Sequence, residues 1–129
     1  MILALVSPTP HLMEQAVDVM MASRAKVQRF SVAHRSVAAR PYALRVALER
    51  DRFNADWLTV VPVADAIEVD TVRRLGGVVG HLLGRVAHPF IRIERHDLII
   101  GLDAPSTGHV IAAADAYSVI RCRYLAARG

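Results

Sequence analysis

Short apolar runs alternate with longer segments of helical periodicity along this chain. The first run, residues 2–6 (ILALV), is apolar at every position, which is typical of a strand covered on both faces in a parallel sheet. Residues 57–63 (WLTVVPV) are rich in β-branched and aromatic side chains, which favour strands. Further strands are predicted at residues 27–32, 78–83 and 98–102, and residues 90–93 are interpreted as either an extra edge strand or part of a loop.

Helices are predicted at residues 11–24, 35–52, 64–75 and 106–127. Pro41 is unfavourable inside a helix, so the second helix is expected to begin near Pro41 or to bend there. Gly76 and Gly77 are expected to end the third, because glycine commonly follows the last helical turn. The alternation predicts a three-layer α/β fold, in which a mainly parallel five-stranded sheet is flanked by helices. A chain of 129 residues is expected to form a single domain, residues 1–129.

Composition limits the environment and the partners. No run reaches the roughly 18 apolar residues that a membrane span needs, and the N-terminal run lacks the basic start of a signal peptide. One cysteine, Cys122, cannot form an internal disulfide, so a cytoplasmic location is expected. The net charge of +4 and the pI near 10.0 keep nucleic-acid binding open, but the arginines are scattered without a dense run, which favours a solvated surface.

Residues 57–79 (WLTVVPVADAIEVDTVRRLGGVV) resemble the deoxynucleoside monophosphate kinases of phages and bacteria, within the P-loop kinase group. The segment LGGVV at 75–79 matches the end of a helix and a valine-rich strand of that family, and Glu68 falls at its acidic position. His88-Pro89 and the strand beginning DLII at residue 97 extend the match downstream. The resemblance implies a P-loop kinase-like domain that spans nearly the whole chain. The Arg-rich composition indicates a GC-rich coding sequence. Together with the resemblance, this composition is consistent with a phage gene.

The phosphate-binding motif of that family, GxxxxGK[ST], is degenerate in this chain. Aligned with the motif, its two glycines, lysine and hydroxyl residue correspond to Ser7, Leu12, Met13 and Glu14. The intervening Pro8 and Pro10 carry no amide hydrogen, whereas a working loop wraps a phosphate with backbone amides, a lysine and a metal-binding hydroxyl. The resemblance therefore implies a kinase-like fold without an intact P-loop, without phosphate transfer and without a cofactor.

The second half of the family's site is also altered, because Pro62 and Ala64 stand where the family has aspartate and arginine. A residual polar site near the position of a lid is an alternative, built from Arg85, His88, Arg92 and Arg95, although these residues are equally well explained as surface charges.

Other polar groups favour structural roles. The six histidines show no metal-site spacing, so no metal is expected. Asp65, Glu68 and Asp70 are interpreted as a solvated face near the positive end of a helix.

Three functions follow. The first is a non-catalytic, pseudokinase-like protein that binds a protein partner, either a host factor if the gene is viral or a second copy of itself. The second is a small nucleotide-binding or kinase enzyme with an altered phosphate site, and the third is a basic nucleic-acid-binding module. Aromatic residues near arginines, as at protein interfaces, predict the interface residues Tyr42, Phe53, Phe90 and Tyr124, although burial would explain these rings equally well.

Overall fold

The computed structural model describes residues 1–23, 26–32, 35–83, 91–102 and 110–128. Its strands are β1 Ile2–Val6, β2 Val27–Arg29, β3 Leu58–Val63, β4 Val78–Leu82, β5 Leu98–Gly101 and β6 Val110–Ala112. Its α-helices are α1 Pro10–Ala22, α2 Arg40–Leu48, α3 Ala66–Arg74 and α4 Ala116–Arg128, and 3-10 turns occupy Val37–Ala39, Asp51–Phe53 and Ala113–Asp115. The strands form one sheet in the order β2-β3-β1-β4-β5-β6, and all its pairings are parallel.

Strand β1 lies inside the sheet, between β3 and β4, and is buried at all five positions. Its side chains alternate between two cores: Leu3 and Leu5 belong to one cluster of buried residues, and Ile2, Ala4 and Val6 belong to the other. This is the environment predicted from its uninterrupted apolar sequence.

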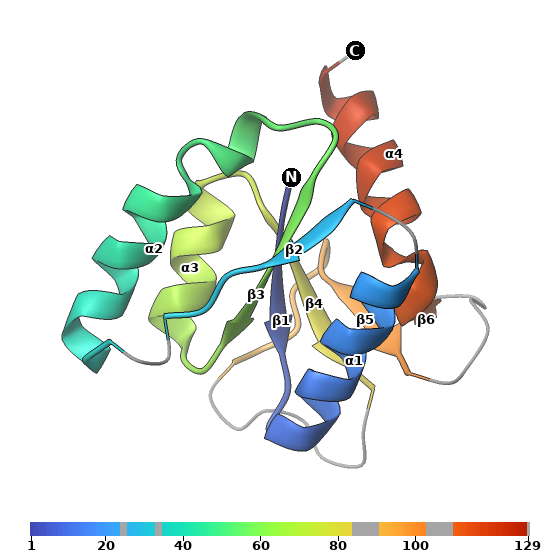
Figure 1. The fold of residues 1–129 in the computed structure, drawn as a ribbon. Helices are drawn as coiled ribbons and strands as arrows, with labels where there is room; N and C mark the ends of the chain where they lie inside the picture. The colour runs from blue at the N-terminus through green and yellow to red at the C-terminus, as the bar shows by residue number, and fades with distance from the viewer. Residues whose placement is uncertain (24–25, 33–34, 84–90, 103–109, 129) are drawn as a thin grey trace.

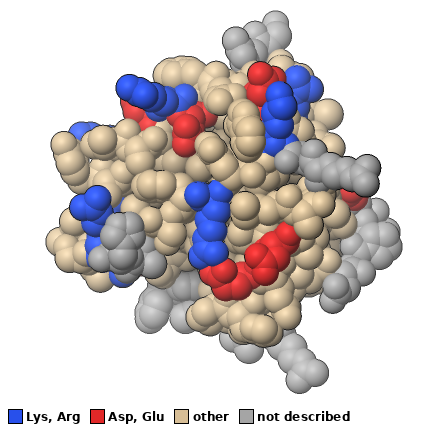
Figure 2. Space-filling model, viewed as in Figure 1, with Lys and Arg blue, Asp and Glu red and all other residues tan. Residues whose placement is uncertain are grey.

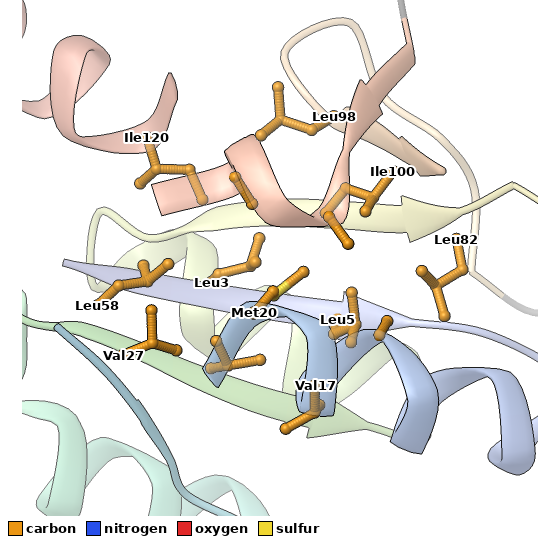
Figure 3. Packing of buried hydrophobic residues seen from close by; sticks show 14 of the residues in the cluster. Leu3, Leu5, Val17, Met20, Val27, Leu58, Leu82, Leu98, Ile100 and Ile120 are labelled. Carbon is orange, nitrogen blue, oxygen red and sulfur yellow. The ribbon is translucent and has the colours of Figure 1, made fainter. Parts of the chain in front are cut away.

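Two helices cover each face of the sheet (Figure 1). On one face, α1 and α4 pack Val17, Met20 and Ile120 against Leu3 and Leu5 (Figure 3). On the opposite face, α2 contributes Leu44 and Leu48, and α3 contributes Val69 and Val72. The predicted α/β architecture, a parallel sheet flanked by helices, is therefore confirmed.

The sheet has six strands rather than the predicted five. The additional strand, β6, lies within residues 106–127, which were predicted to be helical, and α4 begins only at Ala116. Val110 and Ile111 pair with Ile99 and Ile100 of β5 and form the edge of the sheet. Their apolar character is equally compatible with a helix. Short runs of this kind cannot be assigned from periodicity alone.

Strand β2 ends at Arg29, earlier than the predicted 27–32. The Leu58 amide donates to the Lys26 carbonyl at 2.9 Å. In this parallel pairing the same kind of bond recurs every two residues, so the nitrogen of Pro62 lies opposite the carbonyl of Phe30. Because proline has no amide hydrogen, that bond cannot form and the pairing of β2 with β3 stops there.

The helix predicted at 35–52 is shorter, since α2 spans only Arg40–Leu48 between two 3-10 turns. Pro41 lies in the first turn of α2, as expected, where its missing amide hydrogen costs no helical bond. Helix α3 ends where predicted: Gly76 follows with a φ of 77°, which favours glycine, and the Gly77 amide donates to the Val72 carbonyl at 2.9 Å. Residues 91–93 of the segment predicted as an edge strand or loop form no strand.

No helix in the described part of the chain has both the length and the apolar character that a membrane span needs.

Candidate functional site

The carboxyl ends of β1 and β3 form the crevice where ligands bind in open parallel sheets. The two strands are neighbours, but the chain leaves β1 for α1 on one face and leaves β3 for α3 on the other. Such a reversal opens a crevice at the strand ends. The segment directly after β1, which the resemblance aligns with a phosphate loop, lies at the carboxyl ends of these strands (Figure 1).

A hollow of about 340 Å³ occupies the crevice. Its lining comes from the ends of β1, β2 and β3 and from the first turns of the helices: Ser7, Pro8, Pro10, Met13, Glu14, Arg29, Ser31, Arg40, Pro62, Val63, Ala64 and Glu68. We call it the carboxyl-edge hollow. It brings together the degenerate loop and Glu68, two of the features singled out from the sequence.

The connection from β1 to α1 cannot wrap a phosphate. It has only three residues, Ser7 to Thr9, because α1 already begins at Pro10. The Thr9 amide donates to Ser7 Oγ at 3.1 Å, and Ser7 Oγ donates to the Thr9 carbonyl at 3.2 Å. Since Pro8 and Pro10 have no amide hydrogen and the Thr9 amide is bonded to Ser7 Oγ, this connection has no two consecutive free amides with which to hold a phosphate.

The residues at the second glycine and lysine positions are used for packing. Leu12 and Met13 lie in the first turn of α1, where Leu12 is partly buried and Met13 is 9% exposed in the core cluster around Leu5. Met13, at the lysine position, therefore packs in the apolar layer between α1 and the sheet and also lines the carboxyl-edge hollow; Figure 3 shows the packing of other residues of the same cluster.

Glu14, at the hydroxyl position, is held by Arg29. Both guanidinium amino groups of Arg29 donate to the two carboxylate oxygens of Glu14 in a bidentate pair. This hydrogen bond is the main cause that lowers the pKa of Glu14, and it also raises the pKa of Arg29. The carboxylate therefore stays ionised at neutral pH, and Glu14 lines the carboxyl-edge hollow.

Glu68 is buried beneath the hollow, at 2% exposure. Its Oε2 accepts from the Ala64 and Asp65 amides at 2.9 and 3.0 Å, and the Glu68 amide donates to Asp65 Oδ1 at 3.0 Å. This reciprocal arrangement is a capping box for α3. The expectation of a solvated acidic face is therefore wrong for Glu68, whereas Asp70 is exposed.

Burial is the main cause that raises the pKa of Glu68, and the two amide hydrogen bonds oppose that shift. A carboxyl whose pKa is raised by folding stabilises the fold most when it is protonated. This contribution is fully present below the ordinary pKa, 4.5, and is lost as pH rises through the pKa in the folded state. We therefore expect Glu68→Gln to gain stability relative to the wild type as pH increases from 4 to 7, measured by urea unfolding. Glu68→Ala should instead lose about 1–2 kcal/mol because it leaves two amides without an acceptor.

Glu14→Gln is the control, because its stability relative to the wild type should change with pH in the opposite direction. Because pairing lowers the pKa of Glu14, its contribution is present above the ordinary value and is lost as pH falls through the folded value. The carboxylate is half exposed, so the effect should be about 0.5 kcal/mol at neutral pH. If Glu68→Gln and Glu14→Gln shift stability in the same direction with pH, the burial of Glu68 does not control its titration.

A second polar cluster lies on the side of α3 and β4. Asp97 Oδ2 accepts from Arg73 Nη2 at 2.7 Å and from the Glu94 amide at 2.9 Å, and it lies 2.8 Å from His81 Nε2. The side chains of His81 and Asp97 are 8% and 5% exposed. Residues far apart in sequence meet here, so no local pattern could have revealed the cluster. It links three elements rather than presenting an open reactive group.

The predicted residual polar site is only partly described. Arg92 and Arg95 are exposed, whereas Arg85 and His88 lie outside the described residues. The predicted interface residues differ among themselves. Tyr42 and Phe53 are 67% and 68% exposed, Tyr124 packs against the core cluster, and Phe90 lies outside the described residues.

Within the described ranges, no group of three or more His, Cys, Asp or Glu side chains could hold a metal ion, and Cys122 is exposed. Comparison of the chain with models of protein families, with curated proteins and with solved structures gives no match. Its function is therefore inferred from its own residues.

Proposed function

We propose that this chain is a non-catalytic binding protein, built on a P-loop kinase-like scaffold whose phosphate loop has become part of the core packing. One observation carries the proposal. At the point where a phosphate loop would lie, the lysine position is Met13, which is buried in the core.

Three further features support it. The first strand is central, and the loop after it lies at the crevice between strand ends, so the ligand-binding frame of such folds is present. Pro8 and Pro10 remove amides from that loop, and the Glu14–Arg29 pair directs Arg29 to a carboxylate of the chain itself. Aromatic rings lie on the surface beside guanidinium groups, as at protein interfaces: Arg52 lies 4.8 Å from the centre of the Phe53 ring.

We expect ATP, GTP and deoxynucleoside monophosphates to bind more weakly than about 1 mM, equivalent to about −4 kcal/mol, with or without Mg²⁺. The reason is the combined loss of amides, lysine and hydroxyl at residues 7–14. Isothermal titration calorimetry measures the affinity, and a coupled assay should detect no phosphate transfer above background. A micromolar complex with any of these nucleotides would contradict the proposal.

A second candidate function is the binding of a small molecule in the carboxyl-edge hollow. Its volume of about 340 Å³ favours this, because ligand pockets span about 300–1,000 Å³. Such an enzyme or binder would use an altered site, with Glu68 in place of the missing loop chemistry. Thermal-shift screening with non-nucleotide metabolites distinguishes the two, since a hit that disappears in Glu68→Gln would place the ligand in the hollow.

Nucleic-acid binding has less support. On the face drawn in Figure 2, acidic side chains adjoin basic ones. Among the described residues, Arg29 is paired with Glu14. That face does not offer the continuous basic surface on which phosphate contacts depend.

A further inference from the structure

Helices α2 and α3 carry apolar side chains on their outward sides as well as in the core. Tyr42 and Val46 of α2 are 67% and 58% exposed, and Ile67 of α3 is 62% exposed. Tyr42 and Val46 are four residues apart, so they lie one above the other on the helix. Exposed apolar side chains that lie next to one another, as Tyr42 and Val46 do, commonly mark an interaction surface.

A groove of about 300 Å³ runs between these two helices. Its walls are Pro41, Tyr42 and Arg45 on one side and Thr71, Arg74 and Leu75 on the other. We call it the α2–α3 groove. It is at the lower limit of the volume of small-ligand pockets, so it suits one anchoring side chain better than a complete ligand.

The groove has an excess of positive charge. Arg45 lies 6.0 Å from the centre of the Tyr42 ring, and no ion pair engages it among the described residues. Arg74 contacts Asp70 at 3.0 Å, but their side chains are 81% and 56% exposed. Such a pair contributes little and can exchange its partner. Two guanidinium groups therefore line the groove, and among the described residues the only ion pair of either one is this weak contact of Arg74 with Asp70.

We propose that the α2–α3 groove binds an acidic segment of a partner protein, which places an apolar side chain beside Tyr42 and carboxylates on Arg45 and Arg74. Apolar and aromatic groups in the walls, Pro41, Tyr42 and Leu75, suit a protein side chain better than a phosphate backbone. Arginine binds carboxylates in bidentate geometry and is enriched at interfaces. This inference rests on the proposed function, because it names the surface and the partner chemistry of the same binding protein.

The test is selection of random 12-residue displayed peptides on the intact chain, followed by fluorescence anisotropy with the best peptide. The expected peptides carry Asp or Glu on both sides of an aromatic residue or leucine. Their affinity should fall at least about tenfold in Tyr42→Ala and in the double variant Arg45→Glu/Arg74→Glu, the loss expected at an interface anchor. Lys26→Glu, which changes an exposed cation outside the groove, and Leu125→Ala, on α4, should leave the affinity unchanged.

Four outcomes would overturn the proposal. Selected peptides could be basic, or could bind the groove variants as well as the wild type. A 20-nucleotide DNA could bind in a manner that depends on Arg45 and Arg74 when no peptide does. Sedimentation could show a dimer that Tyr42→Ala dissociates, which would mean that a second copy covers the groove. None of these results alters the nucleotide measurements, and only a nucleotide complex would refute the non-catalytic scaffold.

Discussion

Met13→Lys is expected to lower the free energy of unfolding by about 2–3 kcal/mol and to create no measurable affinity for ATP. The substitution restores the one cation that the phosphate motif lacks, but Met13 is 9% exposed and belongs to the cluster that joins α1 to the sheet. A lysine there must bury its ammonium group or extend its stem towards the hollow. The second option keeps the expected cost below the 3–5 kcal/mol of a fully buried, unpaired charge.

Met13→Leu is the matched control, because it preserves the apolar character at nearly the same volume. It should cost less than about 1.5 kcal/mol. Urea unfolding measures both variants, and calorimetry with ATP and Mg²⁺ measures the gain of function. A Met13→Lys variant that is as stable as Met13→Leu and binds ATP would show that the loop backbone is ready for a phosphate, and the proposed function would fail.

The reason for the expected failure of a single restoration lies in the neighbouring residues. The Thr9 amide is already bonded to Ser7 Oγ, and the Glu14 carboxylate remains next to position 13 in α1. A lysine at position 13 would therefore sit beside a negative group and a loop without free consecutive amides. Each of these features would have to change before a phosphate could be held.

Much of the fold could be predicted from single segments, because burial on both faces leaves a direct mark on the sequence. The apolar run at 2–6 and the β-branched run at 57–63 become β1 and β3, with bounds of Ile2–Val6 and Leu58–Val63. The glycine pair after α3 ends that helix, as predicted. Where an element is set by its own residues, the sequence is informative.

Two of the errors arise where a partner strand decides the structure. The end of β2 depends on Pro62 of the neighbouring strand, and β6 exists because β5 offers an edge to pair with. Neither condition is visible in the segment concerned. Predicting them would have required the strand order, which composition and periodicity do not contain.

In the candidate site, too, local features could be predicted from the sequence, whereas features that depend on packing could not. The differences of residues 7–14 from the motif GxxxxGK[ST] are visible in the sequence, and the capping box could have been found from the spacing of Asp65 and Glu68. The burial of Glu68 could not have been predicted from this spacing, because it results from the packing of α3 on the sheet. The pairing of Arg73, His81 and Asp97 joins residues up to 24 positions apart and leaves no local signal.

Asp97→Ala should lower the free energy of unfolding by about 3 kcal/mol. Its Oδ2 is the shared partner of Arg73, His81 and the Glu94 amide, so its removal leaves a buried ring nitrogen and a backbone amide without their partner. The expected cost is at the low end of the 3–5 kcal/mol for breaking a buried pair, because the Arg73 side chain is 27% exposed and keeps Glu94 at 3.3 Å. Urea unfolding at pH 7 measures the loss.

Two further variants separate the contribution of the buried Asp97 contacts from that of the exposed ion pair between Arg73 and Glu94. Asp97→Asn keeps an oxygen acceptor but removes the charge, so it should lose about 1–2 kcal/mol, less than Asp97→Ala. Glu94→Gln alters the outer ion pair of Arg73, where the glutamate side chain is 61% exposed, and it should change stability by less than about 0.5 kcal/mol. Because Asp97 connects the end of α3, the strand β4 and the start of β5, its loss should also disturb the His81 ring resonances in NMR spectra, whereas Glu94→Gln should not. If Asp97→Ala costs no more than Glu94→Gln, the buried carboxylate does not hold these three elements together.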